Sequence, residues 1–425
     1  MLESPTRTDP VAASLSEVVG GPVGDHAGGH RWWSASRALI GVTAVVLGAG
    51  MLAKTACVPS GWGKDQQPYA ELCWTDLAGV SAGRSTPPHV TTYLERAAAT
   101  LPGSGTVATA ASLAVVLAAL ALLVTGLLAR VDARRPWAAA GWAMGPVLLI
   151  DWLSWDLVAA AGVAVLLWGW ATGRSWLAGV GAGIGAAFAL PVAAALAGVI
   201  AVGGRARDRF DALLAAAAAY VVVNVPGRAA IEDPDVGSLW QLVQDVGTLP
   251  SRTVRVVVAL LLLAIAACAV VWLLRRSGPG PVTAARAGLV VLAAALVVAP
   301  SAPPETALLL LPLAAIGVRR WRDLLVWQGC EVVSWVVTGW YLGNALDPTI
   351  TGDARPYWLA ILLRVAGLAW LVASVLRGAA TEPRRPTGPD SGSDSGSGDE
   401  DLVEVGRSEA DPDRDLLADP GDARA

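Results

Sequence analysis

The stretch that decides the fold is 176-WLAGVGAGIGAAFALPVAAALAGVIAVG-203, an apolar run of 28 residues with Pro191 near its middle. Roughly 20 apolar residues suffice to cross the hydrocarbon core of a bilayer, so this run is long for one transmembrane helix. Proline removes a backbone hydrogen bond inside a helix and bends or breaks it. The run therefore predicts two short membrane helices that meet near Pro191.

Ten further apolar runs surround this stretch, and the whole chain is 54% hydrophobic but only 16% charged. Backbone groups in lipid must hydrogen-bond within their own segment, so each run is predicted to be a helix. Together with the broken pair they predict an all-α polytopic membrane protein of about 12 membrane segments, in contact with the lipid bilayer. The ten runs are 38–53, 107–129, 137–151, 156–171, 211–225, 254–274, 285–300, 306–318, 323–342 and 357–376.

Clusters of arginine follow many of these runs and indicate the orientation. Loops on the cytoplasmic side of membrane proteins are enriched in Lys and Arg. Two short helices at 176–203 keep every cluster on that side, whereas a single span would move all later clusters outside. The sequence thus predicts a multi-pass protein of the plasma (inner) membrane with both termini cytoplasmic, and no nucleic-acid partner is needed to explain the arginines.

The two ends of the chain differ in composition from the membrane part. Residues 1–36 are polar and are not expected to form a cleavable signal peptide, and the segment after Arg377 holds 13 acids and five arginines. Such segments cannot bury a core, so 1–36 and 378–425 are expected to be disordered. The membrane domain is then 37–377, with long outer loops at 54–106 and 226–253.

Two of the four cysteines share the first outer loop. Cys57 and Cys73 lie in this loop, whereas Cys268 and Cys330 lie in apolar runs. If the loop faces an oxidising space, a Cys57–Cys73 bridge would close a short loop and stabilise the fold by roughly 3 kcal/mol.

The same loop offers the first catalytic candidate, Asp76, in the segment from Tyr69 to Asp76. A loop carboxylate can act as a general base that takes a proton from an acceptor hydroxyl. Trp74 and Tyr69 beside it suit stacking on a sugar ring. The alternative interpretation is a solvated or capping aspartate.

A second pair of acids, Asp151 and Asp156, bounds the short outer turn Asp151-Trp-Leu-Ser-Trp-Asp156. These carboxylates, with Trp155, could orient an acceptor or hold a divalent metal together with water and phosphate. Helix capping by Ser154 or Asp156 is the alternative, and interfacial tryptophan is common in membrane proteins.

Charges within or beside the later runs supply further candidates. Glu331 and Arg364 lie in neighbouring antiparallel segments, and charges inside a membrane are costly and usually paired. They could pair as a structural contact, or Arg364 could meet a lipid phosphate. Arg228 in the loop 226–253 is a candidate phosphate clamp, or else a solvated loop charge.

An ordered series of stretches resembles one family of enzymes. The chain is similar to the family 87 type of polyprenol-dependent integral-membrane glycosyltransferases of the GT-C superfamily, particularly actinobacterial envelope mannosyltransferases. The stretches that carry the resemblance span residues 54–377 and include Leu72-Cys-Trp-Thr-Asp76, Ser154-Trp-Asp-Leu-Val-Ala-Ala160, Arg320-Trp-Arg-Asp-Leu-Leu-Val-Trp-Gln328 and Ala360-Ile-Leu-Leu-Arg364.

The resemblance implies a GT-C-like fold and transfer of a sugar, with mannose expected, from a polyprenyl-phosphate donor to an envelope glycolipid or polysaccharide on the outer face. It places Asp76 as the base of an inverting displacement and Asp156 as a second outer acid. The leaving group is already a phosphate and needs no strong acid, so the protein is expected to catalyse transfer by positioning the substrates and by electrostatic stabilisation. No cofactor is predicted from the residues, and a divalent metal stays open.

Three stretches differ from the family pattern. Tyr93-Leu-Glu-Arg replaces a Glu-Tyr-Pro segment, Phe188-Ala-Leu-Pro191 lacks a Lys before its Pro, and Ser301-Ala-Pro-Pro-Glu-Thr306 replaces a Ser-Pro-Gln-Tyr-like segment. These differences favour a second hypothesis, a catalytically inactive scaffold or partner of such enzymes. A transporter of lipid-linked sugars is a third, supported by the broken helix at Pro191 alone.

Overall fold

The computed structural model describes residues 34–58, 67–75, 106–133, 135–224, 234–346 and 353–382. These residues belong to one compact unit, 1–385, and contain helices and turns but no strand. The prediction of an all-helical chain is confirmed for the described residues. The expectation of disorder at the two ends of the chain falls outside them for residues 1–33 and 383–425. It is wrong at the two inner margins, because a helix begins at Ala35 and the last helix continues past Arg377 to Thr381.

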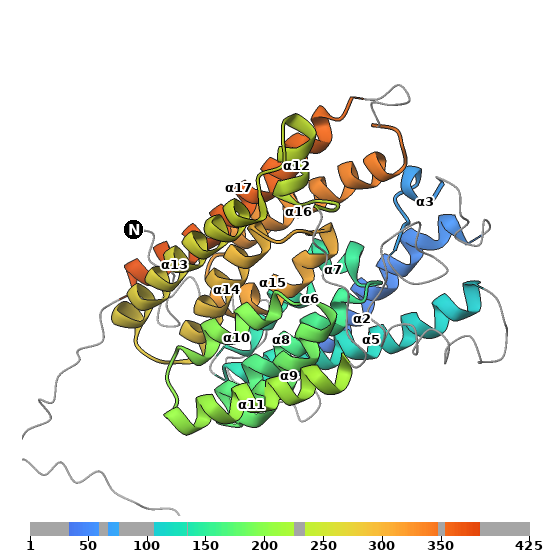
Figure 1. The fold of residues 1–425 in the computed structure, drawn as a ribbon. Coiled ribbons are helices and arrows are strands. Elements are labelled where there is room, and N and C mark those ends of the chain that lie inside the picture. The colour runs from blue at the N-terminus through green and yellow to red at the C-terminus, as the bar shows by residue number, and fades with distance from the viewer. Residues whose placement is uncertain are drawn as a thin grey trace, which may run out of the picture. The chain divides into compact units, whose positions relative to one another are not determined.

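Most of the helices coincide with apolar runs of the sequence, and Figure 1 shows how they are arranged. Those of eight residues or more are α2 Ala35–Ala53, α5 Thr106–Val131, α8 Asp156–Ala171, α9 Ser175–Phe188, α10 Val192–Ile200, α11 Ala206–Val223, α12 Leu239–Val246, α13 Arg252–Ser277, α14 Pro281–Val297, α15 Ala307–Gly317, α16 Trp321–Leu342 and α17 Arg355–Thr381. The shorter ones are η1 Lys54–Cys57, α3 Gln67–Ala70, η2 Pro136–Ala139, α6 Ala140–Ala143, α7 Pro146–Asp151 and η3 Pro304–Thr306.

Four helical segments are long and apolar enough to cross a bilayer: Ala35–Cys57, Ala110–Val131, Arg252–Ser277 and Arg355–Thr381. Four shorter helical segments are also strongly apolar: Asp156–Ala171, Ser175–Phe188, Pro281–Val297 and Pro304–Gly317. These helices support the prediction of a membrane-embedded helical protein.

The long run at 176–203 is divided into two helices. α9 ends at Phe188 and α10 begins at Val192, with Pro191 immediately before it. The glycines of α9 let its neighbours α8 and α11 approach closely. A Cβ at Gly162 of α8 would lie only 2.5 Å from the carbonyl oxygen of Gly181, and one at Gly183 would collide with the carbonyl oxygen of Ala216 of α11. Small residues at such contacts are typical of packing in membranes.

One expected helix is replaced by three short pieces. The apolar run 137–151 was predicted to form one helix, but the structure has η2, α6 and α7 there. The break before α7 falls at Gly145-Pro146, where proline lacks the N–H that would continue α6. As a result α7 ends at Asp151, which begins the turn to α8.

Helix α15 lies at the centre of the packing. All 11 of its residues are buried, and it contacts α5, α6, α7, α8, α14 and α16. At 1.5 Å per residue it is about 16 Å long, and its two ends meet different surroundings. Its first residue follows η3 and the loop 301–306, whereas its last residue, Gly317, precedes a run of arginines.

Candidate functional site

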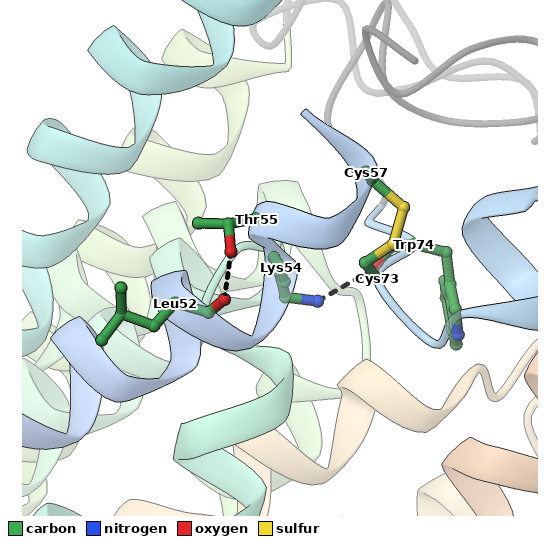
Figure 2. Close-up of a disulfide and its surroundings, with 6 residues drawn as sticks. All are labelled: Leu52, Lys54, Thr55, Cys57, Cys73 and Trp74. Atoms are coloured by element: carbon green, nitrogen blue, oxygen red, sulfur yellow. Dashed lines mark hydrogen bonds between the residues drawn. A yellow bond between two sulfur atoms is a disulfide. The ribbon is translucent and has the colours of Figure 1, made fainter. Parts of the chain in front are cut away.

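A disulfide between Cys57 and Cys73 anchors the first loop to the end of α2 (Figure 2). Cys57 ends the turn η1, which directly follows α2. Lys54 in the same turn is buried, and its Nζ donates a hydrogen bond of 2.9 Å to the backbone oxygen of Trp74. One covalent link and one hydrogen bond therefore hold residues 67–75 against α2.

A buried aromatic cluster surrounds this anchor. Trp74 stacks on Trp335 of α16 with ring centroids 5.5 Å apart. The ring of Tyr69 also contacts Trp74, with centroids 6.0 Å apart. The Nζ of Lys54 lies 5.4 Å from the centroid of the Trp335 ring, which is a cation–π distance. The rings of Tyr69 and Trp74 are buried against one another, so in this conformation they do not present an open stacking surface for a sugar.

The turn between α7 and α8 holds the two predicted acids in different surroundings. Asp156 begins α8, is half-buried, and its backbone N–H donates to the hydroxyl of Ser154 at 3.1 Å. Asp151 is only 3% exposed. Neither of its oxygens accepts a hydrogen bond within the described part of the chain. Burial of an ionisable group in this way is costly and unusual outside functional sites.

Charged side chains from four other segments act electrostatically on Asp151. In order of effect they are Glu305 of η3, Lys54 of η1, Glu331 of α16 and Arg364 of α17. All five residues are at most 5% exposed. We call these five residues the polar cluster; it contains three acids and two bases brought together from across the chain.

Glu331 and Arg364 form a buried ion pair within the polar cluster. The Nε of Arg364 donates to Oε2 of Glu331 at 2.9 Å, and the indole N–H of Trp327 donates to the other oxygen at 3.0 Å. Arg364 also donates through Nη1 to the backbone oxygen of Ala302 and through Nη2 to Thr306 at 2.6 Å. Every nitrogen of its guanidinium that can donate is thus engaged with protein, and the pair fastens the loop before α15.

Helix α12, from the second long loop, covers the start of α17. The hydroxyl of Tyr357 accepts from the backbone N–H of Gly237 at 2.8 Å and donates to Oε1 of Gln241 at 2.7 Å. The indole N–H of Trp358 donates to Asp245 at 3.2 Å. α12 therefore lies against α17 (Figure 1), and Gly237 of the same loop lies next to the guanidinium of Arg364.

Two predicted residues, Asp76 and Arg228, lie outside the described residues. Thr75, immediately before Asp76, is buried and donates its hydroxyl hydrogen to the backbone oxygen of Leu153. The chain that leads into Asp76 is therefore bonded to the turn that carries Asp151 and Asp156.

Carboxylate oxygens of the polar cluster are the ligands that a hard divalent cation would use. Glu331 of the cluster is already paired with Arg364, whereas the oxygens of Asp151 accept no hydrogen bond from the described residues. A different group, formed by Cys57, Glu71 and Cys73, has its atoms within 4.8 Å of one another. Because the two sulfurs are joined in the disulfide, this group does not have free thiolates for a metal.

Sequence reasoning missed Lys54, Glu305 and Trp335. Lys54 carried a signal, since it follows the first apolar run in a loop that is predicted to lie opposite the arginine clusters. Glu305 lies in a short polar break, Ser301–Thr306, between two apolar runs, and was noted only as a departure from a family pattern. Trp335 lies within an apolar run, where nothing distinguishes it from a lipid-facing tryptophan.

Comparison of the chain with protein-family models gave no match, and comparisons with curated proteins and with solved structures gave none either.

Proposed function

We propose that the chain is a membrane glycosyltransferase that transfers a sugar, with mannose expected, from a polyprenyl-phosphate donor to an envelope glycolipid or polysaccharide on the outer face of the plasma membrane. The proposal includes membership of the family 87 type of GT-C enzymes, about 12 membrane segments and cytoplasmic termini. Its support is the ordered resemblance of the sequence together with the polar cluster.

The observation that carries the proposal is the state of Asp151. Its carboxylate is buried, accepts no hydrogen bond from the described residues, and lies within the electrostatic reach of two cations. A purely structural aspartate in such a place would be expected to be hydrogen-bonded. A carboxylate held ready for a hydroxyl of a substrate explains both its burial and its missing partners.

The chemistry is a single displacement at the anomeric carbon. The acceptor hydroxyl oxygen forms the new bond to this carbon while the bond from the carbon to the phosphate oxygen of the donor breaks, with inversion. The acceptor proton passes to a carboxylate, for which Asp76 is the proposed base. Asp151 and Asp156 are proposed to orient the acceptor hydroxyl.

The phosphate leaving group carries away negative charge, which a nearby cation would stabilise. Lys54 is proposed for this role because it is buried within electrostatic reach of Asp151 and begins the predicted loop that contains Asp76. Arg364 is less suited, since its guanidinium is already bonded to Glu331, Ala302 and Thr306. Arg228, from the second long loop, remains a proposed phosphate clamp.

A second candidate function is a non-catalytic partner of such enzymes. It is favoured by the contacts of the cluster: Arg364 is fully engaged, Lys54 donates to a backbone oxygen, and the rings of Trp74 and Tyr69 are buried against each other. A scaffold would need no more than this. The two candidates differ in whether any carboxylate of the site is required for transfer.

The test is sugar transfer in membranes from cells that lack this chain, supplied with radiolabelled polyprenyl-phosphomannose. The deletion is complemented with the wild type, Asp76→Ala, Asp156→Ala or the control Asp353→Ala, at expression levels matched by immunoblot. Asp353 is an exposed acid between α16 and α17 that pairs with Arg355 at 3.8 Å.

The proposal expects a labelled product that depends on the chain, is restored by the wild type and the control, and is lost with Asp76→Ala. Full restoration by both Asp76→Ala and Asp156→Ala would favour the scaffold. A deletion that changes no product from any of a panel of lipid-linked sugars would overturn the enzyme proposal.

A further inference from the structure

A small hollow with a cavity volume of about 50 Å³ lies at the far end of α15 from the polar cluster. Its wall is built from three parts of the chain: the η2–α6 segment, the end of α15 and the start of α16. Arginines from two of these parts line it, namely Arg135, Arg319 and Arg320. We call it the arginine pocket.

The positive charge of the arginine pocket is only partly neutralised. Arg319 lies 3.3 Å from Glu382, but that carboxylate also binds the buried Arg286 at 2.8 Å. No described carboxylate forms an ion pair with Arg135 or Arg320. Two guanidinium groups, each with several N–H donors, are therefore available to an anion.

The remainder of the pocket is apolar. Ala315, Val318 and Leu324 line it beneath the arginines. Trp321 at its edge is 46% exposed, and Trp137 beside it on η2 is 59% exposed. Exposed tryptophans on membrane proteins gather at the level of the lipid headgroups. The pocket therefore combines charged and apolar groups as the interface between lipid headgroups and acyl chains does.

We propose that the arginine pocket binds the phosphate headgroup of an anionic phospholipid. Guanidinium groups bind phosphate oxygens in pairs of charge-assisted hydrogen bonds, and the apolar wall suits the glycerol and first acyl carbons. Basic pockets between helices on the arginine-rich side of membrane proteins bind such headgroups. The proposal does not depend on the glycosyltransferase function, because the pocket and the polar cluster lie at opposite ends of α15.

A free phosphate ion shares the chemistry of the headgroup phosphate but not its apolar part. An inorganic ion would use the guanidinium groups and leave the wall formed by Ala315, Val318 and Leu324 without a role. The exposed tryptophans would also be unexplained. The wall therefore favours the lipid, and the experiment separates the two sources.

The test is native mass spectrometry of the full chain in detergent, titrated with phosphatidylglycerol or with zwitterionic phosphatidylcholine. The pocket variant is Arg135→Gln with Arg320→Gln. The matched control is Arg207→Gln with Arg275→Gln, which removes the same charge from exposed arginines outside the pocket. A third variant, Arg135→Lys with Arg320→Lys, keeps the charge.

We expect the pocket variant to bind phosphatidylglycerol at least about tenfold more weakly than the wild type, because charge-assisted hydrogen bonds are lost. The control should bind phosphatidylglycerol like the wild type, and the lysine variant should have an affinity between those of the wild type and the pocket variant. All four proteins should bind phosphatidylcholine equally. Thermal unfolding of each variant verifies that the fold is retained.

Three results would overturn the proposal. The wild type could bind phosphatidylglycerol no better than phosphatidylcholine. The pocket and control variants could lose binding equally, which would reduce the effect to overall charge. Finally, millimolar inorganic phosphate could abolish the difference between wild type and pocket variant, which would assign the pocket to the free ion.

Discussion

Charged side chains are arranged in opposite ways at the two ends of α15. At one end the polar cluster buries acids and bases together, and its charges come from five separate segments. At the other end the arginine pocket exposes charges of one sign beside tryptophans. Buried mixed charges must be matched in position, whereas exposed charges tolerate change because water screens them. Substitutions should therefore have large effects at the first end and small ones at the second.

The largest effect is expected from separating the buried ion pair. Glu331→Ala leaves Arg364 buried with part of its hydrogen bonding lost, and removal of one member of a buried pair costs about 3–5 kcal/mol. We expect a strongly lowered midpoint of thermal unfolding and little protein recovered in detergent. The paired control is Arg355→Ala, which breaks the exposed contact with Asp353 and should cost at most about 1 kcal/mol.

The double substitution Glu331→Leu with Arg364→Met removes both charges. It therefore separates the free energy cost of an unpaired buried charge from the cost of losing the hydrogen bonds of the pair. It should be more stable than Glu331→Ala, because apolar replacement of a whole buried pair is often neutral. If Glu331→Ala unfolded at the wild-type temperature, the ion pair would not fasten the loop before α15.

A smaller effect is expected from the disulfide. Cys57→Ser opens a bridge between residues 16 apart, and a loop of that size is worth about 3 kcal/mol in the unfolded chain. The unfolding midpoint should fall, and added reductant should lower the wild type to the same value. Cys268→Ser, at an exposed free cysteine, is the control. An unfolding midpoint that responds to neither the substitution nor the reductant would contradict a structural role for the bridge.

The smallest effect is expected at the arginine end, from Glu382. Burial raises the pKa of Glu382, but the hydrogen bond and charge of Arg286 and the charge of Arg319 outweigh it and hold the pKa below its ordinary value of 4.5. Because the folded pKa is the lower one, the contribution to stability is complete above pH 4.5 and is lost as the pH falls through the folded value.

Glu382→Gln should therefore lower stability at pH 7 by about 1 kcal/mol, as for a partly exposed ion pair. The gap between wild type and variant in thermal unfolding should narrow as the pH falls below 4.5. A gap that stays constant from pH 7 to pH 3.5 would show that the charge of Glu382 is not what stabilises this end.

Much of the helical framework could be predicted from the sequence, because hydrophobic length and proline act locally. The division at Pro191 followed from both, and the pairing of Cys57 with Cys73 followed from their shared loop. The division of 137–151 was missed, although Gly145-Pro146 carried the local signal for it.

The composition of the polar cluster could not be predicted, because it depends on which segments pack together. Asp151 and Asp156 looked equivalent in the sequence, yet Asp151 is buried among charges and Asp156 is half-buried at a helix start. Glu305 came within electrostatic reach of Asp151 only through the packing of α15, which directly follows η3, against α7. Asp76, the residue favoured as the base, lies outside the described residues and stays a prediction.

The most direct test of the account is the rate of sugar transfer by purified chain in proteoliposomes, measured for Asp151→Asn against Asp353→Asn. Asparagine has nearly the shape of aspartate, and no described residue donates a hydrogen bond to Asp151, so the fold should persist. If Asp151 orients the acceptor, transfer should fall about 100-fold, while Asp353→Asn should act like the wild type. Transfer at the wild-type rate by folded Asp151→Asn would contradict the claim that the polar cluster is the site of transfer.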